Sequence, residues 1–495
     1  MQQTLTSADL TTTHGHRTYQ RTAILLLCMA AHKAMPDSRV SVEHSLSNGV
    51  YCEIHDKHPL TPKDVVTLEQ DMRALVNQAL DIHVRNYPRA EAIRLLQHSG
   101  NRSGAALLQQ MNIADVDLTE CNGYHDYLSG PVLANSSLVP SFRLNYYLPG
   151  LILQIPEDNS GNIPVYREQP KLAGVYREAE RWAKILNVGD VASVNEVIRR
   201  NEAGDLIRVA EALYEKRIAA VADQVAQNPE IRLITIAGPS SSGKTTSAQR
   251  LKIHLRVNGL RPVTISLDDY FLNREDTPLD DEGKPDFEAL EALDLPLLGE
   301  HLSRLIQGEP VDVPLFDFHT GQRSNQTRRM QIAANQPIII EGIHGLNEQL
   351  TSSVPRGHKF KVYISALTQN NIHDHVRIHT TDVRLIRRMV RDHQFRSHPA
   401  ENTIRMWPMV RRGEVRNIFP FQEEADVMIN SALVYELPVL RVKAEPLLQA
   451  IPQDSPVADV AEQLLWLLRH YEPLESDEIP HSSILREFVG GSCFM

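Results

Sequence analysis

Two observations predict an α/β protein in which a parallel sheet flanked by helices follows an α+β domain. From residue 231 onward, short and nearly continuous apolar runs alternate with helical patterns, which is typical of parallel strands that helices cover on both faces. These runs read IRLITIAG, RPVTISL, QPIIIEG, FKVYISA and ADVMINS. Before residue 165, helical patterns are mixed with short alternating strand patterns such as RVSVEHSL and SFRLNYYL, which predicts an α+β arrangement.

The composition predicts a multidomain globular protein. The chain has 495 residues, of which 42% are hydrophobic and 23% are charged, an ordinary balance for such proteins. No apolar run approaches the roughly 18 to 20 residues that a membrane span needs, and the N-terminus lacks the basic-then-apolar order of a secretion signal. We therefore expect a cytoplasmic protein without a membrane partner. The net charge of −11 gives no strong signal for nucleic-acid binding.

Breaks in the pattern predict five parts of the chain. Helix-forming segments over residues 166–228 separate the α+β pattern from the apolar runs, and an amphipathic helical pattern at 457–471 precedes a polar tail. One helix start is well marked, because Thr61 occupies the N-cap position, Pro62 follows it and Asp64 lies in the first turn. The predicted parts are a flexible tail (1–16), an α+β domain (17–165), a helical connector (166–228), an α/β domain (229–452), and a C-terminal helix and tail (453–495).

A phosphate-binding pattern lies at the start of the α/β domain. The stretch GPSSSGKT, from Gly238 to Thr245, matches GxxxxGK[ST] and stands between a predicted strand and a predicted helix. Its glycines permit tight turns, so that successive backbone N–H groups face an anion at the helix N-terminus. The ammonium group of Lys244 is placed for the β- and γ-phosphates, and the hydroxyl group of Thr245 for Mg²⁺. We expect a nucleoside triphosphate to bind Gly238, Pro239, Ser240, Ser241, Ser242, Gly243, Lys244, Thr245 and Thr246.

Carboxylates follow two of the apolar runs. Asp268 comes after PVTISL, and Glu341 comes after PIII. Ligands of a parallel α/β sheet bind outside the carboxyl ends of its strands, so both acids are expected near the phosphates. Phosphoryl transfer to a hydroxyl group needs one group that orients or deprotonates this hydroxyl and one acid that holds Mg²⁺. We expect Asp268 to perform the first task and Glu341 the second.

A basic segment lies inside this otherwise acidic chain. Between Arg377 and Arg416 there are ten arginines and four acidic residues. Within this segment, DVRLIRRMVRD places several arginines on or beside one helical face. Near a phosphate-binding loop, guanidinium groups can close over a triphosphate and stabilise charge on the transferred group. The sequence therefore predicts a lid on which Arg384, Arg388 and Arg391 share one helical face, with Arg387 beside them.

Six motifs of the C-terminal half follow one another in a family-specific order, namely IAGPSSSGKTT, SLDDYF, PDFE, VPLFDFHTGQR, IIIEGIHGL and RLIRRMVRD. With them, about half of the chain resembles the uridine kinase family of P-loop kinases, which is related to phosphoribulokinase. The resemblance implies an Mg²⁺-dependent enzyme that transfers the γ-phosphate of ATP or GTP to the 5′-hydroxyl of a pyrimidine nucleoside. It implies that Asp268 is the catalytic base, that Glu341 is the Mg²⁺-linked acid, and that Arg387, Arg388 and Arg391 are lid arginines.

The same resemblance assigns the contacts with the substrate. The expected substrate-binding residues are Asp268, Tyr270, Phe316, His319 and Arg323. The loop FDFHTGQR departs from the family, which has a tyrosine at its first position and a base-contacting histidine at its sixth. Here these positions hold Phe316 and Gly321, and His319 stands two places earlier. Because a lost polar contact changes discrimination between substrates, the kinase reaction is predicted more firmly than uridine as its acceptor.

The N-terminal half resembles a different family, the second additional domain beside the editing site of threonyl-tRNA synthetases. The matching segments are MPDSRVSVEHSLSNGVYCEI, LTPKDVVTLEQDM, YPRAEAIRLL and CNGYHDYLSG. That domain normally carries an HxxxH motif and a further cysteine and histidine. Cys121 and His125 match the second pair, but Arg21 and Leu25 replace the first, and neither side chain ligates zinc. We therefore expect no bound zinc at these positions.

Two other functions fit parts of the sequence. The acceptor could be a sugar phosphate, as in phosphoribulokinase, because the arginines near 405–416 supply additional cations. A regulatory or RNA-associated protein that binds nucleotide without catalysis is the other alternative. The combination of Asp268, Glu341 and the lid arginines favours catalysis. The expected partner is a small-molecule nucleoside, and the sequence is compatible with a homo-oligomer.

Overall fold

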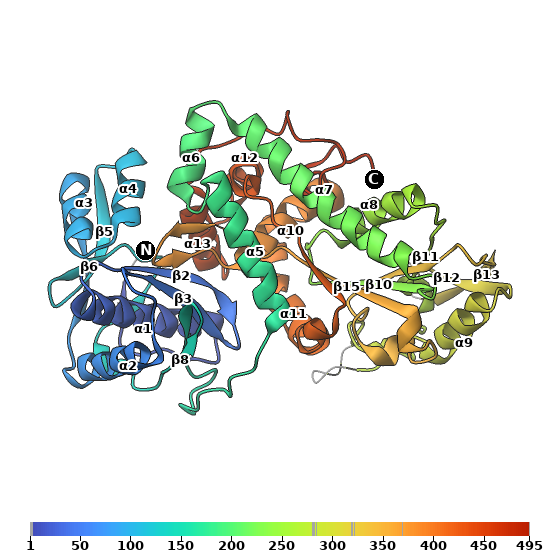
Figure 1. Cartoon of the computed structure of the whole chain (residues 1–495), viewed down its shortest axis with the longest axis horizontal. Helices are drawn as coiled ribbons and strands as arrows, with labels where there is room; N and C mark the ends of the chain where they lie inside the picture. The colour runs from blue at the N-terminus through green and yellow to red at the C-terminus, as the bar shows by residue number, and fades with distance from the viewer. Residues whose placement is uncertain are drawn as a thin grey trace. The chain divides into compact units, whose positions relative to one another are not determined.

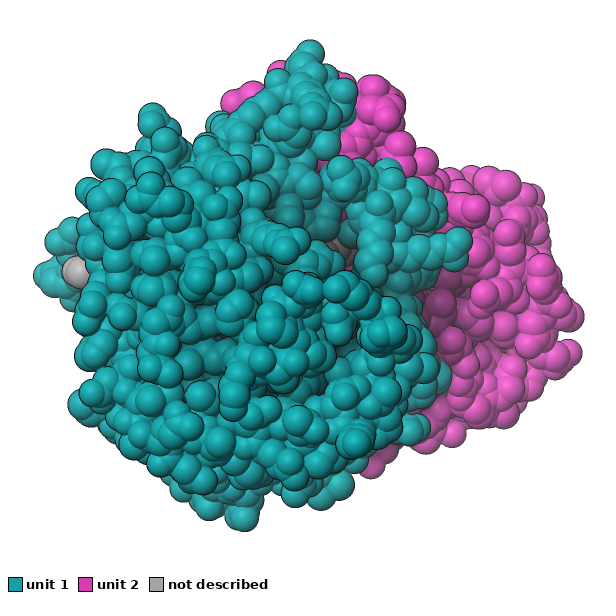
Figure 2. Space-filling model, turned by 60° about the vertical axis from the view of Figure 1, so that its left-hand side comes forward, with its two compact units in different colours: residues 1–203, 368–382, 437–474 teal, residues 204–367, 383–436, 475–495 magenta. Residues whose placement is uncertain are grey.

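The computed structural model describes residues 3–279, 283, 285–317, 320, 322–368 and 370–494. The chain forms two compact units, each built from segments that lie far apart in the sequence (Figure 2). Unit 1 contains residues 1–203, 368–382 and 437–474, and unit 2 contains residues 204–367, 383–436 and 475–495. The units differ from the predicted five parts, because the chain returns to unit 1 twice after it has entered unit 2.

The sheet of unit 2 has five parallel strands in the order β11-β14-β10-β15-β18. The predicted apolar runs form these strands, which confirms the parallel sheet. Their buried positions are rich in isoleucine, valine and leucine, which pack well on a pleated surface. The strands are β10 (Leu233–Ala237), β11 (Val263–Ser266), β14 (Ile338–Glu341), β15 (Lys359–Ser365) and β18 (Val427–Asn430).

Helices cover this sheet. α8 (Lys244–Val257) and α9 (Leu295–Ile306) lie above and below the strands in the view of Figure 1. The apolar side of α9 buries Leu298, Leu302 and Leu305 in a core that also contains residues of β10, β11 and β14. Burial of each such leucine side chain contributes roughly 1.5–3 kcal/mol.

Other elements follow along the same part of the chain. The helices and strands are α7 (Ala203–Gln227), β12 (Val311–Asp317), β13 (Gln322–Met330), α10 (Thr380–Arg396), α11 (Ala400–Asn417) and α14 (Arg486–Val489). The 3₁₀ helices are η2 (Leu267–Tyr270), η3 (Leu290–Ala292), η4 (Glu348–Thr351), η5 (Arg356–His358) and η6 (Phe419–Glu424). β12 and β13 pair antiparallel.

Unit 1 contains antiparallel sheets and helices. One sheet has the order β2-β3-β9-β8, and a second has the order β4-β5-β6. The strands are β2 (Arg39–Leu46), β3 (Gly49–His55), β4 (Ile82–Pro88), β5 (Asp115–Cys121), β6 (Tyr124–Asp126), β8 (Arg143–Tyr147), β9 (Gly150–Gln154), β16 (Asn371–His373) and β17 (Val376–Arg377). The helices are α1 (Thr13–Ala34), α2 (Pro62–Asn77), α3 (Arg89–His98), α4 (Arg102–Gln110), α5 (Pro170–Leu186), α6 (Val191–Arg199), α12 (Glu436–Gln449), α13 (Ala458–Leu468) and the 3₁₀ helix η1 (Ser136–Leu138).

Two local details bear on the predictions for unit 1. The start of α2 is confirmed, since Thr61 and Asp64 form a capping box in which each side chain bonds to the backbone N–H group of the other. Within the first sixteen residues, β1 (Thr4–Leu5) pairs in parallel with β7 (Val132–Leu133). Among the residues that the structure describes, no helix combines the length and the apolar character that a membrane crossing requires.

Candidate active site

The phosphate-binding loop connects the end of β10 to the start of α8, as its sequence predicts. Gly243 has φ +80°, a conformation that favours glycine. Gly238 is required for a different reason, because a Cβ atom at this position would lie 1.9 Å from the backbone oxygen of Ile364 on β15. The two glycines therefore let the loop turn tightly against the sheet before the helix begins.

Lys244, the first residue of α8, folds back over the loop. Its Nζ atom donates hydrogen bonds to the backbone oxygens of Gly238, at 2.9 Å, and Pro239, at 3.0 Å. Burial lowers the pKa of Lys244 to about 8, and the nearby carboxylates of Glu341 and Glu487 oppose this shift. The ammonium group is thus held against the backbone of the loop, where β- and γ-phosphates are expected.

Thr245 and Glu341 form a direct pair at the edge of the sheet. Thr245 Oγ1 donates a hydrogen bond of 2.8 Å to Glu341 Oε1. Glu341 is the last residue of β14, which pairs with β10, the strand that leads into the loop. Burial raises the pKa of Glu341, while Lys244 and Thr245 oppose the shift. A hydroxyl group and a carboxylate thus meet beside the ammonium group.

Asp268 follows the next strand of the sheet. It lies in η2 just after β11, whose Ser266 is in register with Glu341 of β14. The Asp268 side chain reaches solvent, yet the protein atoms around it and the neighbouring Asp269 raise its pKa. Asp268 also contributes to the raised pKa of Glu341, so the two carboxylates are close enough to repel each other.

The predicted lid arginines contact the loop from α10. Arg388 Nη1 donates a 2.8 Å hydrogen bond to Ser240 Oγ. Arg387 is fully buried, forms an ion pair with Glu436 and donates to the backbone oxygen of Ser241 at 3.3 Å. The third, Arg391, forms an ion pair of 2.9 Å with Asp392 of the same helix. The structure thus brings Arg387 and Arg388 to the loop and pairs Arg391 within α10.

The predicted substrate residues are held by η2 and its neighbours. Tyr270 is fully buried, and its hydroxyl group lies 2.9 Å from His301 Nδ1. Arg323 of β13 forms a 2.9 Å ion pair with Asp294 and donates to the backbone oxygens of Phe271 and Tyr270. Arg323 therefore supports the segment that carries Asp268.

Two further predicted residues belong to the β12–β13 hairpin. Phe316 stands in register with Arg323 and lies near the Phe271 ring, with 5.8 Å between the ring centroids. His319 lies outside the described residues.

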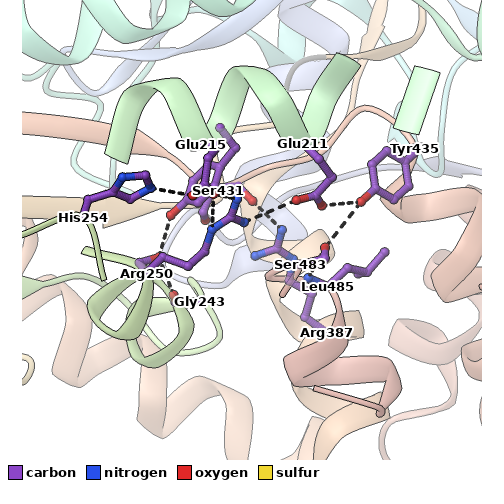
Figure 3. Close-up of polar contacts among 12 residues, drawn as sticks. Glu211, Glu215, Gly243, Arg250, His254, Arg387, Ser431, Tyr435, Ser483 and Leu485 are labelled. Atoms are coloured by element: carbon purple, nitrogen blue, oxygen red, sulfur yellow. Dashed lines mark hydrogen bonds and ion pairs between the residues drawn. The ribbon is translucent and has the colours of Figure 1, made fainter. Parts of the chain in front are cut away.

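Sequence reasoning missed the polar groups that support the loop from the protein interior. Ser431 Oγ donates to the backbone oxygen of Ser242 at 2.5 Å, and Glu414 Oε1 accepts from the N–H group of Ser240 at 2.9 Å. Figure 3 shows Ser431 beside Arg387, whose Nη2 atom donates to its backbone oxygen at 2.8 Å. No local pattern marks Glu414 or Ser431, because each meets the loop only through the tertiary fold.

Helices α7 and α8 are joined by a second missed group. Arg250 Nε donates to Glu215 Oε2 at 2.8 Å, and Arg250 Nη1 lies 3.3 Å from Glu211 Oε2 (Figure 3). Glu211 Oε1 also accepts a 2.6 Å hydrogen bond from the hydroxyl group of Tyr435. These contacts fix the helix that follows the phosphate-binding loop.

In unit 1, the four positions compared above with metal ligands hold side chains that pack or form hydrogen bonds in the interior. Leu25 is fully buried, and Arg21 donates a hydrogen bond to the backbone oxygen of Pro131. Cys121 is fully buried and His125 is 8% exposed. Because Arg21 and Leu25 replace the first pair of ligands, only Cys121 and His125 remain, and these two residues fit a zinc ion poorly.

A separate group of potential ligands lies nearby in the same unit. Among the described residues, Cys28, Asp126 and His375 have ligand atoms within 4.8 Å of one another. Asp126 already accepts hydrogen bonds from Asn101 at 2.7 Å and from the N–H group of Tyr127 at 2.8 Å, and it pairs with His375 at 2.8 Å. The group is therefore a satisfied buried network.

Known proteins resemble the part of the chain that contains the loop. Residues 233–437 match the model of the Phosphoribulokinase / Uridine kinase family. A uridine kinase from Deinococcus deserti is 32% identical over 199 residues, which are 40% of this chain and 86% of that protein. A uridine kinase from Chloroflexus aurantiacus is 31% identical over 225 residues, which are 44% of this chain and 97% of that protein.

A solved structure, that of a possible uridine kinase from Bacillus stearothermophilus, is 24% identical and covers 29% of this chain and 79% of its own, with a TM-score of 0.23. The residues matched by the family model, 233–437, include the loop, Asp268, Glu341 and the arginines of α10. The chain therefore belongs to the phosphoribulokinase / uridine kinase family.

Proposed function

We propose that this protein is a nucleoside kinase that transfers the γ-phosphate of ATP or GTP to the 5′-hydroxyl of a pyrimidine nucleoside. The family is that of phosphotransferases, and the relatives named above are uridine kinases. The acceptor class is taken from these relatives. The residues that would perform the transfer are those predicted from the sequence, and their contacts in the structure support the proposal.

One observation carries the proposal. The loop, Glu341 and Asp268 follow the three adjacent parallel strands β10, β14 and β11, at their carboxyl ends. Adjacent strand ends place a phosphate-binding loop, a carboxylate paired with its threonine, and a solvent-accessible carboxylate along one edge. Phosphate transfer to an alcohol needs a phosphate-binding group, a metal site and an acceptor site side by side. The loop, the pair of Glu341 and Thr245, and Asp268 would supply them in this order.

The residues present fit a magnesium ion. Mg²⁺ prefers oxygen ligands and is held by one or two protein groups together with phosphates and water. The Thr245 hydroxyl group and the Glu341 carboxylate, 2.8 Å apart, would hold it directly or through water. When bound, the ion would neutralise charge on the phosphate oxygens.

We assign the proton transfer to Asp268. Its carboxylate would accept the hydrogen bond of the acceptor hydroxyl group and take its proton as the new O–P bond forms. At the same time the bond between the γ-phosphorus and the β–γ bridging oxygen would break, which releases the nucleoside diphosphate. Lys244 and Arg388 would hold the phosphate oxygens, and Arg391 would join them when the nucleotide provides a competing anion for its guanidinium group. Arg387, which is fully buried, would position Ser241 of the loop.

For residues 17–165, we propose a fold related to the second additional domain of threonyl-tRNA synthetases, without the metal chemistry of that domain. The proposal is supported by the sequence motifs and by the side chains at the ligand positions. Arg21 donates to a backbone oxygen and Leu25 is buried.

A product assay tests the proposed reaction. The full chain would be incubated with Mg²⁺, ATP or GTP, and a panel of pyrimidine nucleosides, purine nucleosides and sugar phosphates, and the products identified by mass spectrometry. We expect a nucleoside 5′-monophosphate from a pyrimidine nucleoside, and no product from Lys244→Ala. Phosphorylation of a sugar phosphate alone would contradict the acceptor, and nucleotide binding without any transfer would contradict the kinase activity.

A further inference from the structure

The C-terminal segment, residues 475–495, belongs to unit 2 although it lies outside the family-matched range 233–437. It is firmly packed there. Ser483, Ile484, Leu485 and Phe488 are fully buried. In Figure 3, Ser483 and Leu485 lie beside Arg387 and Tyr435, and the Ser483 and Tyr435 hydroxyl groups are 3.4 Å apart.

This segment touches the phosphate-binding loop directly. Thr246 Oγ1 donates a 2.7 Å hydrogen bond to Glu487 Oε2, and the N–H group of Thr246 donates to the same oxygen at 3.3 Å. Ile484 packs so closely on Gly243 that a Cβ atom there would lie 2.6 Å from its Cγ2 atom. Both Thr246 and Glu487 are buried, with exposed fractions of 1% and 5%.

The donors that Glu487 occupies are of the kind that phosphates use. Thr246 is the third residue of α8, so its N–H group has no acceptor within the helix. The N-terminus of a helix carries partial positive charge, and in a phosphate-binding loop its free N–H groups bind anionic oxygens. A carboxylate from the far end of the chain here takes the place of an anion.

The Glu487 carboxylate interacts electrostatically with Lys244 and Glu341 of the candidate site. Burial lowers the pKa of Lys244, and Glu341 and Glu487 both oppose this shift by attraction. Glu487 also contributes to the raised pKa of Glu341, for which burial is the largest cause. A triphosphate entering the loop therefore meets the same negative charge that now interacts with Lys244.

We propose that Glu487 is an internal competitor for the phosphate site, which a nucleotide must displace from Thr246 in order to bind fully. The inference rests on the proposed use of the loop 238–246 for a nucleoside triphosphate. It assigns to the C-terminal segment the control of nucleotide affinity. The alternative is that Glu487 only positions Thr246, in which case its removal weakens nucleotide binding.

Calorimetric titration separates the two. We would titrate three full-length proteins with Mg-ATP and with inorganic tripolyphosphate: the wild type, Glu487→Gln and the matched control Glu478→Gln. The Glu478 carboxylate lies on the same segment as Glu487 and pairs with Arg208. Glutamine keeps the size and an acceptor oxygen but removes the charge. We expect Kd to fall about fivefold or more for both ligands in Glu487→Gln, because one nearby like charge is removed. The difference in Kd between the wild type and Glu487→Gln should become smaller as salt is added. Glu478→Gln should have the same Kd as the wild type.

Hydrogen exchange of the wild type gives an independent readout that needs no variant. Displacement predicts that amides of residues 483–490 exchange faster when Mg-ATP is bound. An unchanged or larger Kd in Glu487→Gln, or slower exchange in this segment, would overturn the inference and leave the proposed function intact. Absence of ATP binding in the wild type and in Glu487→Gln alike would instead overturn the proposed function.

Discussion

Lys244 shows how the loop changes the chemistry of a single side chain. An exposed lysine has a pKa near 10.4. In this loop, burial lowers the pKa of Lys244 to about 8, although two carboxylates oppose the shift. Its ammonium group donates hydrogen bonds to the backbone oxygens of Gly238 and Pro239. Burial of this positive charge costs free energy, which a bound anion would offset.

This shift predicts how nucleotide affinity depends on pH. Below the lowered pKa, Lys244 is protonated and attracts phosphate, and above it the free protein holds a neutral amine. We expect the Kd for Mg-ATP to rise as the pH increases through about 8, with proton uptake on binding near that pH. Calorimetry in buffers of different ionisation enthalpy measures this uptake. A Kd that is constant from pH 7 to about 9.5 would contradict the assignment.

At the scale of elements, the turn between β10 and α8 depends on close contact between strands. Gly238 is the first residue after β10, and its Cα lies directly against the backbone of β15. A backbone oxygen cannot move aside as a flexible side chain can, because it belongs to a strand of the sheet. The absence of a side chain at this position is therefore a structural requirement of the turn.

The contact predicts a stability effect. Gly238→Ala should lower the free energy of unfolding by about 1–3 kcal/mol, because the added carbon would meet the Ile364 oxygen. Denaturant unfolding followed by circular dichroism measures the change. Gly357→Ala is the matched control, since nothing lies within 4 Å of the added carbon there. Equal losses in both variants would show that the close contact is not the cause.

The elements of unit 2 that form the proposed phosphate site could be predicted from the sequence. Continuous apolar runs identified all five parallel strands, and the spacing of glycines and Lys244 identified the loop. The position of Asp268 and Glu341 just after two runs was enough to place them at one edge, since parallel strands end on the same side. These features are local in sequence, and the rule that parallel strands end on the same side of the sheet is enough to bring them together.

Other features could not be predicted, because they depend on contacts between distant segments. Glu414 and Ser431 meet the loop through the tertiary fold, and Glu487 does so from the other end of the chain. A helical pattern of arginines indicated a lid, but it could not show that Arg387 would be paired with Glu436. Charge pairing in the interior has no short-range signature.

At the scale of the whole molecule, the chain order does not follow the units. The last residues, 475–495, return to unit 2 and complete its interior. Phe488 is fully buried, and its ring lies 4.9 Å from the Arg387 guanidinium carbon. The end of the chain is therefore part of the structure that holds the phosphate-binding loop.

This packing predicts that a single change near the C-terminus destabilises unit 2. Phe488→Ala should cost about 3–5 kcal/mol, since it removes a large buried ring and leaves a cavity. Phe395→Ala, at a side chain that is 49% exposed, should cost far less. Thermal unfolding of the two variants checks the difference, and similar melting temperatures would show that the segment is not structurally coupled to unit 2.

The central claim is that Asp268 readies the acceptor hydroxyl group beside a nucleotide held by the loop, and single-turnover transfer by Asp268→Asn tests it most directly. We predict that the rate of phosphate transfer falls by about 100-fold or more, because the general base is lost, while the Kd for nucleotide changes little. Asp269→Asn is the neighbouring control and should retain most of the rate. A transfer rate in Asp268→Asn equal to that of the wild type would contradict the account.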